Sequence, residues 1–571
     1  MDRSVASWMR GDSNAVKRYG ARDEGSMVRV LTPVLARIAG LRPATNRKVL
    51  VEPGVRVPAP DGIELVTDLH LPCPVGRRPT ILMRSPYGRG PLWSAMAGAL
   101  AQRGYNVVVQ SCRGTFGSGG SIDLKLEAGD GRSTADWIIR QAWSNGEIGT
   151  FGPSYLSFVQ WALASTRPPQ LKAMAIQIMA SERRRSYYPG GSFALDTTLS
   201  WVYGVSHQEE RTGLARLGAR RQRSRALAAA FRHLPLLETD LVGIGRRTPM
   251  FQDWLQHEQP GDPYWEPLDF SRIIPSLGVP VSMVGGWYDY YLPYLLEDHA
   301  ALVRAGAPVR LTVGQWRHSS PAGFLTGLRQ ALEWFDVHLL GWNVEPDPAG
   351  VRVAMMGGGG WRELRAWPPE SVATRWYLQA GRGLAPTAPL PAEPDRYRYE
   401  PADPTPAVGG TSLSSNSGPR DNRGLEARAD VVTYTSQPLA GELEIIGNVT
   451  ADLYFSSSLE HTDVFARLCD VAPGGRSTNV CDGLLRLRPA EPPPAADGSV
   501  RVRVELWPTA HRFRRGHRIR LQVSSGAHPR YARNPGGGEP LATATTMLGA
   551  DQAVHHDPEH PSALLLPVVA D

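Results

Sequence analysis

The residues of this sequence best suited to covalent chemistry are Ser154, Asp289 and His318. Ser154 stands in the segment 151–155, Phe-Gly-Pro-Ser-Tyr, where a short apolar run ends in a Gly-x-Ser turn and an amphipathic segment with helical spacing follows. This layout is typical of a nucleophile elbow, which lifts a serine hydroxyl off a sheet edge, beside a base and backbone N–H groups. We therefore predict Ser154 as a nucleophile. The Tyr155 N–H, at the start of the next helix, would stabilise a developing negative charge.

Asp289 and His318 each follow a predicted strand, at 279–285 and 309–313. A catalytic triad can have its residues in the chain order serine, aspartate, histidine. In such a triad the histidine takes the serine proton, and the buried aspartate fixes the histidine tautomer and stabilises the imidazolium. Each residue also has an alternative role when it is considered singly. Ser154 or Asp289 could be a helix N-cap, and His318 could be a residue of a turn. Their common placement at strand ends, in this chain order, favours a catalytic triad.

The elements that would position these residues alternate between strand and helix. Asp61-Gly62 predicts a hairpin over residues 49–71. Strands alternating with helices indicate a doubly wound sheet, in which ligands bind at the carboxyl ends of the strands. The predicted strands of this sheet span residues 79–84, 105–110, 172–179, 279–285 and 309–313, and the predicted helices include 127–143 and 323–340.

The rest of the chain has a different character. Residues 181–261 are helical, aromatic and rich in arginine, which indicates an insertion that caps the site; its arginines form either a solvated helix face or an anion site. Beyond residue 346, short alternating strands between turn residues indicate an all-β sandwich or jelly roll. We predict four parts: an N-terminal extension with a short amphipathic helix (1–47), an α/β-hydrolase domain (48–180 and 262–346), a helical cap (181–261) and a C-terminal jelly-roll domain (347–571).

Composition narrows the class of protein. The 571 residues include 62 basic and 55 acidic ones, a net charge of +7 that gives no reason to expect nucleic-acid binding. No stretch approaches the ~18 apolar residues of a membrane span, and no signal pattern is seen, so a cytoplasmic protein is expected. The helix predicted within 27–40 either packs on its own protein or lies on a membrane surface. Cys469 and Cys481 flank a turn and are either packed thiols or a cross-strand pair.

Further sequence blocks include Arg84-Ser85-Pro86-Tyr87, Phe151-Gly152-Pro153-Ser154-Tyr155 and Gly286-Trp287-Tyr288-Asp289. Together with other blocks along the chain, they resemble the CocE/NonD hydrolases, the group containing cocaine esterase, α-amino acid ester hydrolases and X-Pro dipeptidyl-peptidases. The resemblance implies an α/β-hydrolase fold with a helical cap and a jelly roll, and a serine acyl hydrolase with Ser154, Asp289 and His318 as its triad. It also implies that the Tyr87 hydroxyl joins the Tyr155 N–H in an oxyanion hole. The blocks span residues 55–62, 84–87, 113–114, 151–155, 188–191, 286–289, 314–318, 463–468, 516–520 and 556–561.

The sequence departs from the family pattern in three places. Ser157 stands where the family usually has glycine, so helix packing behind the nucleophile is expected to differ slightly. Ser111 stands where an aspartate is common, so any salt bridge made by that aspartate is expected to be missing. The basic stretch before residue 48 is not part of the best-known members.

We expect a serine hydrolase that cleaves a carboxylic ester or amide of a small molecule through an acyl-enzyme, without a cofactor or metal. Trp161 and Trp287, with Trp201, either line the substrate site or pack in the core. The first alternative function is an X-Pro dipeptidyl-peptidase, which needs carboxylates that grip a free amino terminus. The second is a catalytically silent protein that binds a sugar or polymer. The cap carboxylates available to a peptidase are Glu209, Glu210, Asp253 and Glu258.

Overall fold

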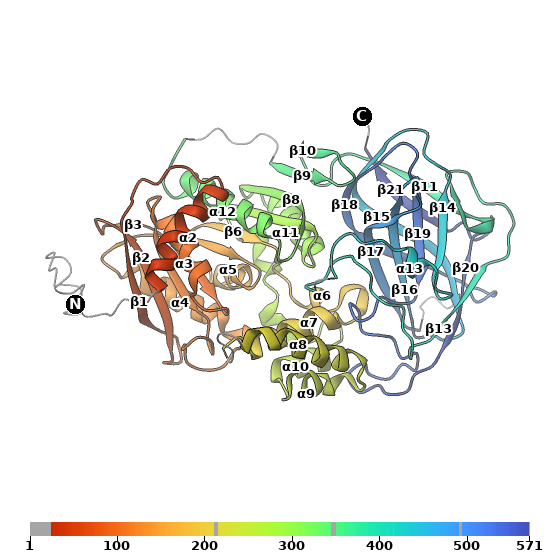
Figure 1. Ribbon diagram of the computed structural model, residues 1–571, viewed down its shortest axis with the longest axis horizontal. Helices are drawn as coiled ribbons and strands as arrows, with labels where there is room; N and C mark the ends of the chain where they lie inside the picture. Colours follow the sequence, from red (N-terminus) through yellow and green to blue (C-terminus); the bar gives the residue numbers. More distant parts are fainter. Residues whose placement is uncertain (1–23, 210–214, 344–349, 415, 490–493, 570–571) are drawn as a thin grey trace.

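The computed structural model describes residues 24–209, 215–343, 350–414, 416–489 and 494–569. An α/β body and an all-β body lie side by side, and a layer of helices lies against both (Figure 1). The α/β body contains one sheet of ten strands in the order β1-β2-β4-β3-β5-β6-β7-β8-β9-β10. These strands are β1 (Val49–Pro58), β2 (Glu64–Pro72), β3 (Arg78–Ser85), β4 (Asn106–Ser111), β5 (Ser144–Pro153), β6 (Leu171–Gln177), β7 (Val281–Tyr288), β8 (Val309–Arg317), β9 (Val351–Met355) and β10 (Gly360–Leu364).

The middle of this sheet is parallel, from β4 through β3, β5, β6, β7 and β8 to β9, with antiparallel strands at both edges. Helices cover both faces, so the central strands are buried on both sides, and their middle residues are apolar. Along β3, Ile81 and Met83 pack against α3 and α12, whereas Leu82 packs against α4 and α5. The helices are α2 (Glu24–Ile38), α3 (Pro91–Ala101), α4 (Glu127–Ile139), α5 (Tyr155–Ser165), α11 (Leu292–Arg304) and α12 (Pro321–His338).

The strands and helices predicted for this body are present, with two differences. Helix α4 ends at Ile139 instead of Trp143, because the chain turns at Arg140 into β5, which starts at Ser144. Residues 351–364, which we placed in the C-terminal domain, instead form β9 and β10 and extend the hydrolase sheet, since β9 pairs in parallel with β8. The alternating sequence pattern of a short strand does not indicate which sheet the strand joins.

Helix α2 forms as predicted but packs through a different face. Among the described side chains of α2, Thr32 and Ala36 are buried, as is Ala39 directly after the helix, and Thr32 lies against Gly98 of α3. The small side chains allow close approach to α3, and most of the larger apolar residues described in α2 face solvent. Among the described side chains of α2, the exposed large apolar residues are Val30, Leu31, Val34 and Ile38.

The cap consists of α6 (Arg184–Tyr187), α7 (Leu195–Ser206), α8 (Ala215–Arg232), α9 (Thr239–Ile244) and α10 (Pro249–Gln256). It lies between the two sheet-containing bodies (Figure 1). Backbone hydrogen bonds join it to the C-terminal domain, from the Leu237 N–H to the Ala542 carbonyl at 2.9 Å and from the Asp196 N–H to the Pro529 carbonyl at 2.9 Å.

The C-terminal body is an all-β domain, as predicted, with one eleven-stranded sheet. Its pairings are antiparallel apart from that of β12 with β14. Inward-facing residues such as Leu453, Val464 and Leu521 fill its core. The strands are β11 (Val372–Gln379), β12 (Gly383–Ala385), β13 (Asp395–Tyr399), β14 (Val432–Ser436), β15 (Leu443–Ser457), β16 (Thr462–Val471), β17 (Ser477–Leu487), β18 (Val500–Phe513), β19 (Arg518–Ser524), β20 (Ala550–His555) and β21 (Ala563–Val568), with a short helix α13 (Arg423–Glu426).

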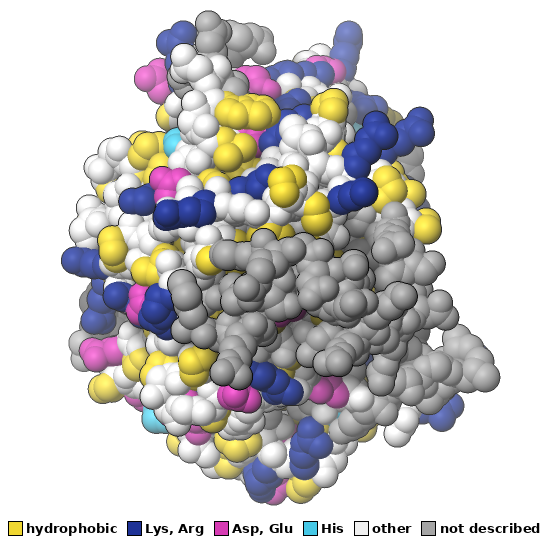
Figure 2. Space-filling model, turned by 90° about the vertical axis from the view of Figure 1, so that its left-hand side faces the viewer, with side chains coloured by type: hydrophobic (Ala, Val, Ile, Leu, Met, Phe, Trp, Pro, Cys, Tyr) yellow, Lys and Arg dark blue, Asp and Glu magenta, His cyan; other side chains and the backbone are white. Residues whose placement is uncertain are grey.

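Figure 2 shows the side of the molecule formed by the α/β body. In the described part of this face, Lys and Arg side chains are interspersed with Asp, Glu and hydrophobic ones and form no continuous basic stripe (Figure 2). None of the helices in the described part of the chain has the length and apolar character that a membrane-spanning helix requires.

Candidate active site

Ser154 lies in the tight turn between β5 and α5. Its backbone has a φ of 58° and a ψ of −124°, a conformation that non-glycine residues rarely adopt and that is found at functional turns. Gly152 precedes the turn with a φ of 140°, and a Cβ there would lie 2.5 Å from the Leu156 side chain. The glycine is therefore required both by its backbone angle and by the close approach of α5.

The three predicted triad residues converge on this turn. The His318 Nε2 lies 2.9 Å from the Ser154 Oγ, and the His318 Nδ1 lies 2.6 Å from the Asp289 Oδ2. The Asp289 side chain is fully buried, and its other oxygen accepts a hydrogen bond of 2.8 Å from the Tyr291 N–H. This arrangement suits a proton transfer from serine to histidine with the aspartate holding the imidazole.

Ser157, a departure from the family pattern, braces the turn. Its hydroxyl donates to the Gly152 carbonyl at 2.6 Å and accepts from the Gln177 N–H at 2.8 Å. The Ser154 N–H in turn donates to the Gln177 carbonyl at 2.9 Å. Ser157 thus links the end of β5 to the end of β6 directly behind the nucleophile.

The second departure, Ser111, takes part in a different network. The Ser111 hydroxyl accepts a hydrogen bond from Arg89, which also pairs with Asp68 at 3.0 Å. Nearby, Arg113 pairs with Asp130 at 2.7 Å and with Asp61 at 2.5 Å. Arg113 therefore has two carboxylate partners although the aspartate common in the family is missing.

Tyr87 faces the nucleophile from the loop after β3. Its hydroxyl accepts a hydrogen bond of 3.0 Å from the Trp201 Nε1 of the cap. Burial raises the pKa of Tyr87 to about 12, while hydrogen bonding to Trp201 and to Ser154 acts in the opposite direction. The phenol is therefore protonated at neutral pH and available as a donor beside Ser154.

The Tyr155 side chain is part of the support under the turn, separate from the predicted role of its N–H. Its hydroxyl donates to the Glu127 Oε1 at 2.9 Å, and Glu127 pairs with Arg84 at 2.8 Å. All three side chains are buried. The first residue of α5 is thereby tied to α4 and to the end of β3.

The two tryptophans predicted for substrate binding are in other roles. Trp161 is fully buried in the core, and Trp287 is 3% exposed and donates to the Ala354 carbonyl of β9 at 2.6 Å. Both are packing residues. The sequence could not show this, because helix and strand positions that face the core look alike in sequence whether or not a ligand is near. Trp201, which contacts Tyr87 and stacks on Tyr155 with ring centroids 5.9 Å apart, is the tryptophan at the site.

The cap carboxylates do not share a partner. Glu209 accepts from the Phe116 N–H at 3.0 Å, and Glu258 pairs with Arg488 of the C-terminal domain at 3.6 Å. Asp253 is near Tyr264, whose pKa is raised by burial and by this carboxylate. Glu210 lies outside the described residues.

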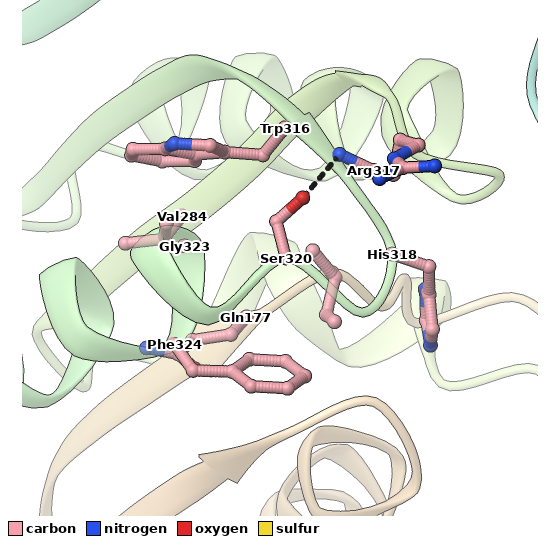
Figure 3. Close-up of a pocket in the computed structure, with 9 residues that line it drawn as sticks. Gln177, Val284, Trp316, Arg317, His318, Ser320, Gly323 and Phe324 are labelled. Atoms are coloured by element: carbon pink, nitrogen blue, oxygen red, sulfur yellow. Dashed lines mark hydrogen bonds between the residues drawn. The ribbon is translucent and has the colours of Figure 1, made fainter. Parts of the chain in front are cut away.

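A small cavity lies beneath the loop that carries His318 (Figure 3). The Ser320 hydroxyl accepts from the Arg317 N–H at 2.9 Å and closes the turn after β8. The side chains of Phe324 and Gln177 face this turn from α12 and β6 (Figure 3). The cavity belongs to the support of the histidine loop, because its lining comes from the strand ends and helix that hold the loop.

The remaining candidate groups lie away from this site. The four cysteines are free; Cys481 lies opposite Leu468, one residue out of register with Cys469 because of a β-bulge.

Among the described residues, the group with metal-ligand spacing is Asp497, His555 and His560, with ligand atoms within 4.8 Å of one another. His560 already hydrogen-bonds to Asp497 at 3.0 Å.

Comparison with known proteins identifies the family. Residues 61–320 match the model of the X-Pro dipeptidyl-peptidase (S15 family), and residues 343–565 match that of the X-Pro dipeptidyl-peptidase C-terminal non-catalytic domain. The chain is 33% identical to cocaine esterase of Rhodococcus sp. (strain MB1 Bresler), over 91% of this chain and 98% of the relative. It belongs to the CocE/NonD hydrolase family. The resemblance seen in the sequence is thereby confirmed.

Solved structures show the same fold. An α-amino acid ester hydrolase superimposes with a TM-score of 0.76 at 23% identity, covering 91% of this chain and 97% of that one. An aminopeptidase from a marine sediment archaeon superimposes with a TM-score of 0.74 at 23% identity, covering 92% and 96%. This CocE/NonD member thus has the α/β-hydrolase domain and the all-β domain of its relatives.

Proposed function

We propose that this protein is a serine esterase that hydrolyses small carboxylic esters through a covalent acyl-enzyme. The observation that carries the proposal is the continuous hydrogen-bonded chain from Asp289 through His318 to Ser154, at 2.6 Å and 2.9 Å. The relatedness to cocaine esterase supports an ester as the substrate class.

In the proposed mechanism, His318 takes the Ser154 proton as the hydroxyl attacks the ester carbonyl. The Tyr87 hydroxyl and the Tyr155 N–H donate to the oxyanion of the tetrahedral intermediate. His318 then gives its proton to the leaving alcohol, and the acyl group remains on Ser154. Water, deprotonated by His318, attacks the acyl-enzyme and releases the acid.

An X-Pro dipeptidyl-peptidase is the second candidate because of the family models that match. It is less well supported, since two of the cap carboxylates have separate partners, the Phe116 N–H for Glu209 and Arg488 for Glu258. A comparison of the rates on an X-Pro anilide and on a simple aryl ester separates the two activities.

From the sequence we also propose a cytoplasmic location.

The test of the proposal is Ser154→Ala. We expect kcat to fall by about 10³-fold or more, because loss of the nucleophile leaves only binding and oxyanion stabilisation. Labelling by a fluorophosphonate probe should disappear in the same variant. Ser165→Ala is the matched control, since Ser165 lies on the same helix, at its far end, and donates to the Ala162 carbonyl. More than about one per cent of the wild-type rate in Ser154→Ala would contradict the assignment.

A further inference from the structure

A buried arginine beside the proposed active site has no carboxylate partner among the described residues. Arg183 is 4% exposed and lies between β6 and α6. Its Nη1 donates to the Tyr291 hydroxyl and to the Met179 sulfur at 3.1 Å each, and its Nη2 donates to the Tyr187 hydroxyl at 2.5 Å. Its Nε is buried without a hydrogen-bond partner. Three of the five guanidinium donors are therefore used, all on neutral groups.

The other buried arginines in the described part of the chain each have a carboxylate or backbone carbonyl acceptor, although Arg84, Arg530 and Arg533 also have one buried guanidinium nitrogen without a hydrogen-bond partner. Arg84 pairs with Glu127 at 2.8 Å, and Arg467 pairs with Asp482 at 2.9 Å. Arg103 donates instead to the carbonyls of Arg42 and Ala99. Arg113, Arg530 and Arg533 likewise have carboxylate or backbone carbonyl acceptors. Removing a cation from water without an anionic or carbonyl partner is unfavourable, so Arg183 is an exception that calls for a function.

Aromatic rings account for part of the environment of Arg183. Its Cζ lies 4.8 Å from the Tyr187 ring centroid, 5.2 Å from that of Phe158 and 5.5 Å from that of Tyr291. Such contacts stabilise a cation but offer no acceptor for an N–H in the guanidinium plane. They hold the group rigidly and leave the Nε edge without a partner.

The position of Arg183 connects it with the reacting groups. Tyr291, which accepts one of its hydrogen bonds, has its ring centroid 5.7 Å from that of His318. Phe158, under its guanidinium, is on the first turn of α5 after Ser154. The charge of Arg183 also acts on Tyr87, the proposed oxyanion donor. Tyr291 connects Arg183 with His318, the proposed base.

We propose that Arg183 binds a carboxylate carried by the substrate, so that the preferred esters bear an anionic group remote from the scissile bond. This inference rests on the proposed function, because the ester must be attacked by Ser154. The planar guanidinium would hold the carboxylate through Nε and a remaining N–H of Nη2. The same charge disfavours substrates with a free ammonium group at this place.

The first experiment uses the wild-type protein. Aryl esters carrying a carboxylate on the acyl chain, such as 4-methylphenyl hydrogen adipate, are compared with the corresponding neutral carboxamide. A second pair carries the carboxylate or carboxamide on the phenol. We expect kcat/KM to be about 10- to 100-fold higher for the carboxylate in at least one pair, mainly through a lower KM. Equal or better turnover of both carboxamides would overturn the proposal.

The second experiment replaces the charge. In Arg183→Met, the ratio of kcat/KM for the carboxylate over the carboxamide should fall to about one, whatever the absolute rates, because the discrimination depends on the guanidinium. Arg183→Lys should keep part of the ratio. Arg103→Met is the matched control, since Arg103 is equally buried and has backbone carbonyl partners. A purely structural role would lower both rates together and leave the ratio unchanged, which would refute the proposal.

Failure of this inference is distinguishable from failure of the proposed function. If the wild-type protein is labelled by the fluorophosphonate and hydrolyses the neutral esters without preferring the charged ones, the carboxylate site is refuted and the esterase remains. If no ester is hydrolysed and no label is taken up, the esterase proposal fails and the carboxylate site fails with it.

Discussion

At the scale of single residues, the site combines a strained nucleophile with donors held in place by the cap. Ser154 adopts a φ of 58°, and His318 is 2.9 Å from its hydroxyl. The Tyr87 phenol is positioned by a hydrogen bond of 3.0 Å from Trp201, a residue that lies more than a hundred positions further along the chain. A hydroxyl fixed in this way is organised for the oxyanion before substrate binds.

Tyr87→Phe should therefore lower kcat for a simple aryl ester by about 10²- to 10³-fold with a smaller change in KM, because an oxyanion donor acts in the transition state. Steady-state kinetics with matched unfolding curves checks this expectation. Trp201→Phe, which removes only the group that positions the phenol, should have the smaller effect. A Tyr87→Phe enzyme with the wild-type kcat would exclude Tyr87 from the oxyanion hole.

At the scale of elements, the junction of β5 with α5 is held by contacts on each side. Ser157 joins it to β6 through Gly152 and Gln177, and Tyr155 joins it to Glu127 and thus to α4. Because these partners come from separate elements, the strain at Ser154 is supported by the packing of the whole sheet edge. Gly152 provides the close approach that this packing needs.

Gly152→Ala should destabilise the hydrolase domain by about 1–3 kcal/mol and lower activity, because the added Cβ overlaps the Leu156 side chain. Gly146→Ala is the control: Gly146 is also on β5, with a φ of 95°, but no atom lies within 4 Å of an added Cβ. Urea unfolding and kcat separate the clash from backbone strain. Similar losses in the two variants would show that the contact with Leu156 has no effect of its own.

At the scale of the whole molecule, the cap and the two sheet-containing bodies form one packed unit. Besides the backbone bonds of Leu237 and Asp196, the Arg533 side chain donates to the Arg232 carbonyl at 2.7 Å. Helix α7, which carries both Asp196 and Trp201, is thus held from the side of the all-β domain. Three histidines whose rings lose most of their contact with water lie in the hydrolase sheet, in α11 and in the C-terminal domain. They are His70, His299 and His528.

Burial lowers the pKa of each of these three histidines from 6.5 to about 4. The unfolded chain therefore binds more protons between these values, and the stability provided by the neutral rings is present above pH 6.5 and lost as the pH falls toward 4. Asp298 acts in the opposite sense, since burial raises its pKa to about 7. We expect the histidines to dominate, so that stability is lower at pH 5 than at pH 8.

His70 offers a single-site test, because neither of its ring nitrogens has a partner. His70→Leu should reduce the loss of unfolding free energy between pH 8 and pH 5 by about 2 kcal/mol, the value that follows from titration at pKa 4 against 6.5. Urea unfolding at both pH values measures this loss. His233→Leu is the control, as His233 is partly exposed and pairs with Glu238. The same pH dependence in His70→Leu and wild type would contradict the assignment.

The sequence by itself determined the parallel sheet, the C-terminal all-β domain and the candidate triad. Buried β-branched strands, helical periodicity and the Gly-x-Ser turn are local patterns, and the strand ends carry Ser154, Asp289 and His318 in a fixed order. The resemblance added Tyr87, which no local pattern marks. These signals are readable because each depends on neighbours in the chain.

Only the tertiary structure decided which side chains surround the nucleophile. Trp161 and Trp201 both lie on apolar helices, yet one is in the core and the other holds Tyr87. The run 182–185, Glu-Arg-Arg-Arg, gives no sign that Arg183 alone is buried between aromatic rings. The reason is physical: burial and charge compensation depend on distant residues such as Tyr291, and the strand that accepts β9 is fixed by packing rather than by the pattern of β9 itself.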